Sequence, residues 1–188
     1  MSTRLEVEDY PARDLTTVLN RRVEYCPDKA WIVTAEREFS YREMDTRSGQ
    51  LAQGMIDAGI GCGDTVLIML PDTVDFVLTW CALSKFGAIE VPVNVHNRGN
   101  PLAYLINDSL ARSLIVDVRF LDRIDAIGDE LSQLERLILF DPSAEFDLSS
   151  FPRLTAKFDI LRLDDLYSDT LYSGPAPAYY DLMGVLYT

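Results

Sequence analysis

The chain has 188 residues, of which 48% are hydrophobic, and its formal net charge at pH 7 is −13. This length and apolar content suffice for one large domain with a packed core. The negative charge disfavours nucleic acid and anionic membranes as main partners, because both would repel the protein. No stretch approaches the roughly 20 apolar residues of a membrane span, and the three cysteines lack disulfide or metal-site spacing. We expect a soluble, cytoplasmic protein.

The first third of the sequence predicts two helices and a hairpin. Residues 1–13 are expected to be a loose lead-in to a helix that Asp14 can cap. Residues 30–40 should form a hairpin of two short strands. Ser40 and Glu43 then fit a capping box, in which Ser40 accepts from the amide three residues on and Glu43 reaches back to the cap amide. This pattern is the clearest helix start in the sequence.

Residues 65–94 form the centre of the sequence and predict a strand, a helix and a second strand. The first apolar run, residues 65–70, shows no polar alternation, which is typical of a strand buried on both faces. The helix that follows is apolar over much of its surface, and Gly87 can end it. Because a crossover of this length joins parallel strands, we expect a parallel pair here.

Further strands and helices extend this unit. Asn100 and Pro101 predict a helix start, with Asn100 as cap and Pro101 at the first helical position. Apolar runs at residues 113–118 and 136–140 predict two more strands, and an apolar stripe over residues 120–134 predicts the helix between them. We therefore predict an α/β fold: a doubly wound, mainly parallel sheet with helices on both faces.

The last part of the chain carries a weaker pattern. Residues 158–163 are expected to form a strand and residues 164–167 a helical turn. Residues 182–187 predict another buried strand, and because the sequence stops directly after it, we expect a piece of a larger protein. Such a truncation would expose an apolar patch and a sheet edge, so we expect a homodimer or other self-association through this region.

The sequence contains no familiar constellation of catalytic residues. The single histidine, His96, has no serine or cysteine nearby in sequence with which to form a nucleophile pair. The glycines of residues 59–63 precede a predicted strand, whereas a phosphate-binding loop must open a helix. The residues alone therefore predict an α/β domain but assign no function to it.

A series of short motifs, however, has a recognisable order and spacing. The motifs are FSYREM at residues 39–44, GDTV at 63–66, LSKFGA at 83–88, VPVN at 91–94, LINDS at 105–109, LIVD at 114–117 and LMGVLYT at 182–188. Together they resemble the amino-terminal signatures of the AMP-forming, adenylate-forming ligases, a superfamily of acyl-CoA synthetases, luciferases and peptide-synthetase adenylation domains. The segment WCALSKFGA at residues 80–88 is most similar to acyl-CoA synthetases, in particular to those related to carnitine-CoA ligase.

The resemblance covers residues 14–188 and implies part of an N-terminal AMP-binding domain, truncated at the start of the phosphate loop. In this family a carboxylate attacks the α-phosphate of ATP with Mg²⁺ present, and the thiol of coenzyme A then displaces AMP. The implied partners are a small-molecule carboxylic acid, ATP, Mg²⁺ and coenzyme A, in a role such as fatty acid metabolism. Thr188 matches the first residue of the phosphate loop. We therefore expect the 188 residues alone to be inactive and to bind no cofactor tightly.

Two further residues are matched by the resemblance. His96 and Arg98 lie in a loop that in some acyl-CoA ligases carries a basic residue touching the nucleotide part of coenzyme A. This chain has VHN at residues 95–97 where many relatives have Pro-Arg-Leu, so a solvated loop with an incidental histidine is the alternative. No catalytic residue or metal ligand is assigned. For the whole chain, the alternative is a stand-alone α/β interaction or ligand-binding module without catalysis.

Overall fold

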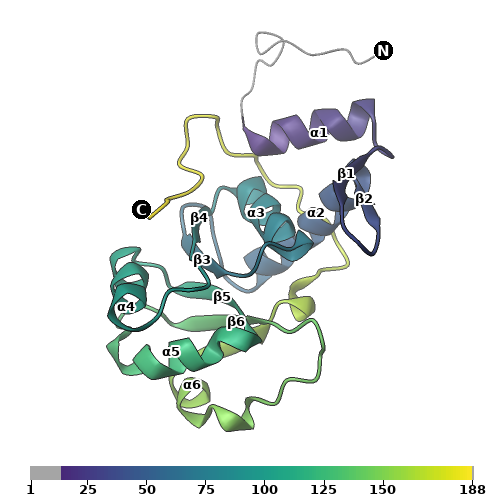
Figure 1. Ribbon diagram of the computed structural model, residues 1–188. Coiled ribbons are helices and arrows are strands. Elements are labelled where there is room, and N and C mark those ends of the chain that lie inside the picture. Colours follow the sequence, from purple (N-terminus) through teal and green to yellow (C-terminus); the bar gives the residue numbers. More distant parts are fainter. Residues whose placement is uncertain (1–13, 188) are drawn as a thin grey trace.

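The computed structural model describes residues 14–187 (Figure 1), so the lead-in predicted at residues 1–13 and Thr188 lie outside the described residues. The helices and strands are α1 (Leu15–Tyr25), β1 (Ala30–Val33), β2 (Glu38–Ser40), α2 (Tyr41–Asp57), β3 (Thr65–Met69), α3 (Val74–Phe86), β4 (Ile89–Pro92), α4 (Gly99–Asp108), β5 (Ser113–Asp117), α5 (Leu121–Ile127), β6 (Arg136–Phe140), α6 (Pro152–Lys157) and β7 (Asp159–Arg162). Short 3₁₀ turns connect several of them, including η2 (Val118–Phe120) and η5 (Asp164–Leu166).

Five strands form one parallel sheet in the order β4-β3-β5-β6-β7. Strand β4 lies on one side of β3, and β5, β6 and β7 follow one another on its other side. The strand order therefore reverses at β3. Strands β1 and β2 form a separate antiparallel hairpin. The predicted hairpin and the predicted doubly wound α/β fold are both confirmed.

Helices cover both faces of the sheet (Figure 1). On one face Leu67, Leu114 and Leu137 pack with residues of α4, α5 and α6. On the other face Val66 and Ile115 pack with residues of α2 and α3. Because successive side chains of a strand point to opposite faces, both faces of a central strand must be apolar here, which is why these strands show no polar alternation. Within residues 14–187, no helix combines the length and apolar character that crossing a membrane requires.

The helix ends follow the predicted capping residues in part. The Ser40 hydroxyl accepts from the Glu43 amide at 3.2 Å, as the capping box requires. The Glu43 carboxylate, however, is paired with Arg37 at 2.9 Å, so the reciprocal half of the box is replaced by an ion pair. Helix α3 ends at Gly87, whose φ of 78° lies in the left-handed region that glycine adopts without strain.

Two predicted helix boundaries differ from the structure. Helix α4 begins at Gly99 with Arg98 at the N-cap position, so Pro101 lies within the first turn rather than at its start. Proline is tolerated there because amides of the first turn have no intrahelical acceptor. The helix predicted over residues 120–134 is regular only in α5, although Leu131 beyond it is still buried. An apolar stripe therefore identified the buried side chains correctly but overestimated the helix length.

The prediction of a buried strand at residues 182–187 is wrong. These residues make one isolated parallel bridge to β4, between Gly184 and Glu90. Leu182 and Leu186 are 58% and 74% exposed. A strand is stabilised by neighbours along its ladder and on its faces. This run has contact with β4 at one position and leaves apolar side chains in solvent, so its apolar sequence does not suffice to form a strand.

Candidate site at the carboxyl edge of the sheet

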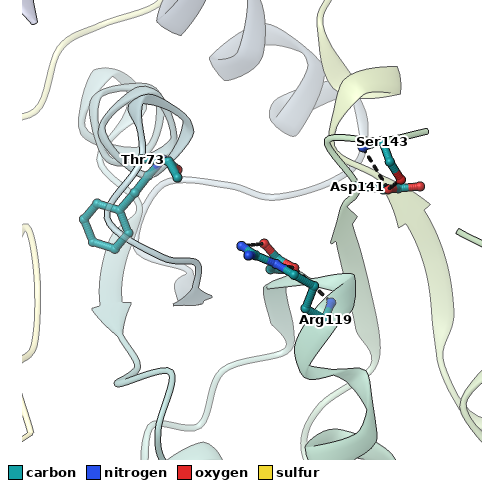
Figure 2. Close-up of polar contacts among 6 residues, drawn as sticks. Thr73, Arg119, Asp141 and Ser143 are labelled. Carbon is teal, nitrogen blue, oxygen red and sulfur yellow. Dashed lines mark hydrogen bonds and ion pairs between the residues drawn. The ribbon is translucent and has the colours of Figure 1, made fainter. Parts of the chain in front are cut away.

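The carboxyl ends of the parallel strands define the edge at which open α/β sheets bind ligands, especially where the strand order reverses. In this protein the edge is formed by the segments that follow β3, β4, β5 and β6. Figure 2 shows the polar side chains of this edge, with Thr73 at the start of α3, Arg119 after β5, and Asp141 with Ser143 after β6.

Asp117, at the end of β5, fixes the guanidinium group of Arg119 at this edge. The Asp117 side chain is fully buried, and one oxygen accepts from the Arg119 amide and Nε, both at 2.9 Å. The other oxygen accepts from Nη2 at 2.7 Å. These hydrogen bonds raise the pKa of Arg119 above its ordinary value. The guanidinium is therefore held in one orientation by a two-point contact, while its own side chain is 61% exposed.

A second arginine lies beside the first. The guanidinium carbon of Arg119 lies 5.7 Å from the centroid of the Phe120 ring. The guanidinium carbon of Arg123 lies 4.5 Å from the same centroid. The Nε and Nη1 atoms of Arg123 are buried and have no hydrogen-bond partner among residues 14–187. Both guanidinium groups thus contact the Phe120 ring, and the charge of Arg119 is already paired with Asp117.

Asp141, after β6, organises the neighbouring loop. One of its oxygens accepts from the Ser143 hydroxyl at 2.7 Å, and the other accepts from the Phe146 amide and from Arg162 Nη2, each at 2.9 Å. These contacts, that of Ser143 foremost, lower the pKa of Asp141 to about 2. The carboxylate is thus ionised at neutral pH, but its acceptor positions are occupied by the loop and by β7.

The structure places the residues predicted from the resemblance at the same edge. His96 and Arg98 lie in the loop between β4 and α4, and both are exposed. The Asn94 side chain accepts from the His96 amide at 2.9 Å and so fixes the turn. Their proposed contact with coenzyme A stays a prediction. Thr188 lies outside the described residues; its neighbour Tyr187 donates its hydroxyl to Asp108 at 2.8 Å.

We did not predict Arg119, Arg123 or Asp141 as site residues from the sequence. A signal was present, because Asp117 and Asp141 both stand at the end of predicted strands, where ligand-binding side chains gather. The pairing of Asp141 with Arg162 carried no such signal, since it depends on β6 and β7 being neighbours.

The described residues do not form a complete site for Mg²⁺ or for a triphosphate. Over residues 14–187 no three His, Cys, Asp or Glu side chains come together in a way that could hold a metal ion. Asp117 and Asp141 are engaged by Arg119 and Arg162. The helices α3 and α4, which start at this edge, begin with TVDF and NRGNP rather than with a glycine-rich loop.

Comparison with known proteins gives the family. The family of AMP-binding enzymes matches residues 19–188. Among curated proteins, the 3-hydroxybenzoate/4-hydroxybenzoate CoA ligase of Thauera aromatica is 31% identical over 108 residues, which is 57% of this chain and 21% of that ligase. Malpibaldin synthetase of Mortierella alpina is 33% identical over 111 residues, 58% of this chain and 2% of the synthetase. The chain thus spans a small part of the curated relatives that it matches.

Solved structures show the same fold. The anthranilate CoA ligase AuaEII in complex with anthranoyl-AMP has a TM-score of 0.78 at 22% identity, covering 96% of this chain and 33% of that one. A long-chain-fatty-acid CoA ligase from Archaeoglobus fulgidus has a TM-score of 0.75 at 23% identity, covering 95% and 35%. The sheet and its helices therefore correspond to a third of an acyl-CoA ligase chain. With the family match over residues 19–188, the resemblance to the adenylate-forming ligases is confirmed, and the chain belongs to the family of AMP-binding enzymes.

Proposed function

We propose that this chain is the first part of the N-terminal domain of an ATP-dependent acid–thiol ligase. The whole enzyme would join a carboxylic acid to AMP and then transfer the acyl group to coenzyme A. The observation that carries this proposal is the family match over residues 19–188, on a sheet with the fold of acyl-CoA ligases. The relatives include a ligase of hydroxybenzoates and a ligase of medium- and long-chain fatty acids, and the latter supports fatty acid metabolism as the setting. The acidic composition supports a cytoplasmic location.

The 188 residues by themselves do not adenylate an acid in this proposal. The described residues lack a grouped set of metal ligands, and the phosphate loop of the family would begin at Thr188. ATP, Mg²⁺ and coenzyme A therefore belong to the longer polypeptide. His96 and Arg98, exposed at the carboxyl edge, are our candidates for a contact with the nucleotide part of coenzyme A.

Pyrophosphate release tests both halves of the proposal. The purified chain and the polypeptide encoded by the complete reading frame are each incubated with ATP, Mg²⁺ and a panel of aromatic acids, fatty acids and carnitine. We expect acid-dependent release from the longer polypeptide only. Release by the 188 residues would contradict the inactivity of the chain. A reading frame that ends at Thr188 would instead favour the stand-alone interaction or ligand-binding module.

We also propose that the chain self-associates through the region of residues 182–187. The support is the exposure of Leu182 at 58% and Leu186 at 74%, together with the bridge that places Gly184 beside the edge strand β4. Light scattering at rising concentration should show a dimer or larger species, and Leu182→Glu with Leu186→Glu should reduce it. A monodisperse monomer at high concentration would exclude this proposal.

A further inference from the structure

One side chain on the edge strand β4 lies directly under the last described segment, residues 182–187. The Glu90 amide donates to the Met183 carbonyl at 3.0 Å, and the Glu90 carbonyl accepts from the Val185 amide at 2.9 Å. Gly184, between them, approaches the Glu90 side chain so closely that an added Cβ would lie 3.0 Å from its Cγ and 3.3 Å from Oε1. The backbone of the segment therefore covers the Glu90 carboxyl group.

This carboxyl group is half-buried, and one of its two oxygens is enclosed without compensation. Its Oε2 atom is inaccessible and has no hydrogen-bond partner among residues 14–187. Burial raises the pKa of Glu90 from 4.5 to about 7. A carboxylate in such a place loses hydration and gains no hydrogen bond, whereas the neutral acid loses much less.

The elements that pack around Glu90 supply no balancing charge. Strand β3 and residues 182–187 consist of uncharged side chains, TVLIM and LMGVLY. On α3, Cys81 is the titratable neighbour, and burial raises its pKa to about 12, so the thiol is neutral at pH 7. Lys85, one turn further on, is held by Asp45 of α2 at 2.6 Å. A charge on Glu90 would thus be unbalanced where the segment covers it.

We propose that Glu90 is a proton-dependent clasp: its protonated carboxyl group allows residues 182–187 to lie on β4, and its ionisation favours their release. The inference goes beyond the proposed ligase activity and does not depend on it, since it concerns the attachment of the segment itself. If the ligase proposal also holds, the clasp controls the position of the residues that lead to Thr188.

The sign of the pH dependence follows from linkage. Burial raises the pKa of Glu90 to about 7 in the attached state, and we expect the pKa to fall toward its ordinary value of 4.5 when the segment leaves. Attachment is therefore at full strength below pH 4.5, weakens as pH rises to about 7, and levels off above it. One proton is released with the segment, so the attachment constant falls by at most about ten-fold per pH unit within this window. The hydrogen bond between Tyr187 and Asp108 is a second anchor, which keeps the released segment near the protein.

Amide hydrogen exchange of the 188-residue chain, followed by NMR between pH 4.5 and 8, tests the clasp. After correction for the intrinsic exchange rate, the protection of the Val185 amide should fall toward pH 7, while that of Ile115 in the core stays constant. In Glu90→Gln, which keeps the size but cannot ionise, protection of Val185 should be independent of pH. The matched control Glu145→Gln, at an exposed position, should behave like the natural chain.

Three results would overturn the proposal: constant protection of Val185 in the natural chain, an equal fall in Glu90→Gln, or a fall shared by Ile115. Direct titration of the Glu90 carboxyl carbon by ¹³C NMR gives an independent answer on the natural chain, even if the variant fails to fold. A midpoint close to 7 supports the clasp, and a midpoint near 4.5 with the segment still attached refutes it.

Discussion

Strand β5 and residues 182–187 are both short apolar runs, yet only the first is a strand. Strand β5 lies between β3 and β6, and all five of its residues are buried. Residues 182–187 meet β4 at one bridge and expose most of their apolar side chains. The difference shows that apolar sequence supplies the tendency to form a strand, while neighbours on the ladder and on both faces supply the stability.

Replacing one leucine by alanine in each region should give the largest difference in the free energy of unfolding. Leu114 in β5 is completely buried, so Leu114→Ala should lower the free energy of unfolding by about 2–5 kcal/mol. Leu186 is 74% exposed, and Leu186→Ala should change the free energy of unfolding by less than about 0.5 kcal/mol. Urea denaturation measures both values. Equal losses in the two variants would mean that residues 182–187 are packed in solution as firmly as the sheet.

Glycine substitutions extend the contrast to backbone contacts. A Cβ at Gly54 of α2 would lie 1.6 Å from the Leu166 carbonyl oxygen, so Gly54→Ala must separate α2 from η5. We expect a loss of about 1–3 kcal/mol, or more if the turn is displaced entirely. A Cβ at Gly184 would meet the Glu90 side chain at 3.0 Å, and the exposed segment can move away. Gly184→Ala should therefore leave global unfolding nearly unchanged but reduce amide protection at Val185; an unfolding loss as large as that of Gly54→Ala would contradict this.

The two regions should also respond to pH in opposite directions. In the loop that follows β6, hydrogen bonds from Ser143 and its neighbours lower the pKa of Asp141 from 3.8 to about 2. Asp141 therefore stabilises the fold above pH 3.8, and this contribution is lost as pH falls toward 2. At residues 182–187, by contrast, attachment weakens as pH rises, because the pKa of Glu90 is raised.

Asp141→Asn should remove part of the acid dependence. Between pH 5 and 2, the urea midpoint of the natural chain should fall more steeply than that of Asp141→Asn, although the variant is less stable at pH 5. Asp169→Asn, at an exposed position, is the matched control and should retain the natural slope. Parallel curves for Asp141→Asn and the natural chain would show that Asp141 titrates at its ordinary pKa.

The sequence was sufficient for the parts of the fold that depend on local pattern. Uninterrupted apolar runs located β3, β5 and β6, and Ser40 and Gly87 marked the ends of two helices, because capping depends on a few adjacent residues. Helix α6 has 6 residues, too few for a periodic pattern, and was not predicted. Residues 182–187 were misjudged because the ladder that they lack cannot be seen in their own sequence.

The candidate site was predicted less completely. The resemblance identified the loop of His96 and Arg98, and the structure places it at the carboxyl edge. The contact of Arg119 with Asp117 is local and could have been inferred from an aspartate near the end of a predicted strand. The contact of Asp141 with Arg162 joins β6 and β7, so it required the order of the strands.

The smallest expected effect concerns Tyr187, the second anchor of residues 182–187. Tyr187→Phe removes the 2.8 Å hydrogen bond to Asp108, which should weaken the attachment of the segment by about 0.5–1.5 kcal/mol and hardly change global unfolding.

Burial and, to a smaller extent, the hydrogen bond to Asp108 raise the pKa of Tyr187 to about 12. In Asp108→Asn the phenol should therefore titrate lower, but still above 10, because burial is unchanged. Ultraviolet absorbance between pH 9 and 12.5, compared with Tyr187→Phe to isolate this residue, measures the shift; a Tyr187 that titrates at 10 in the natural chain would show that the anchor between Tyr187 and Asp108 is open throughout that range.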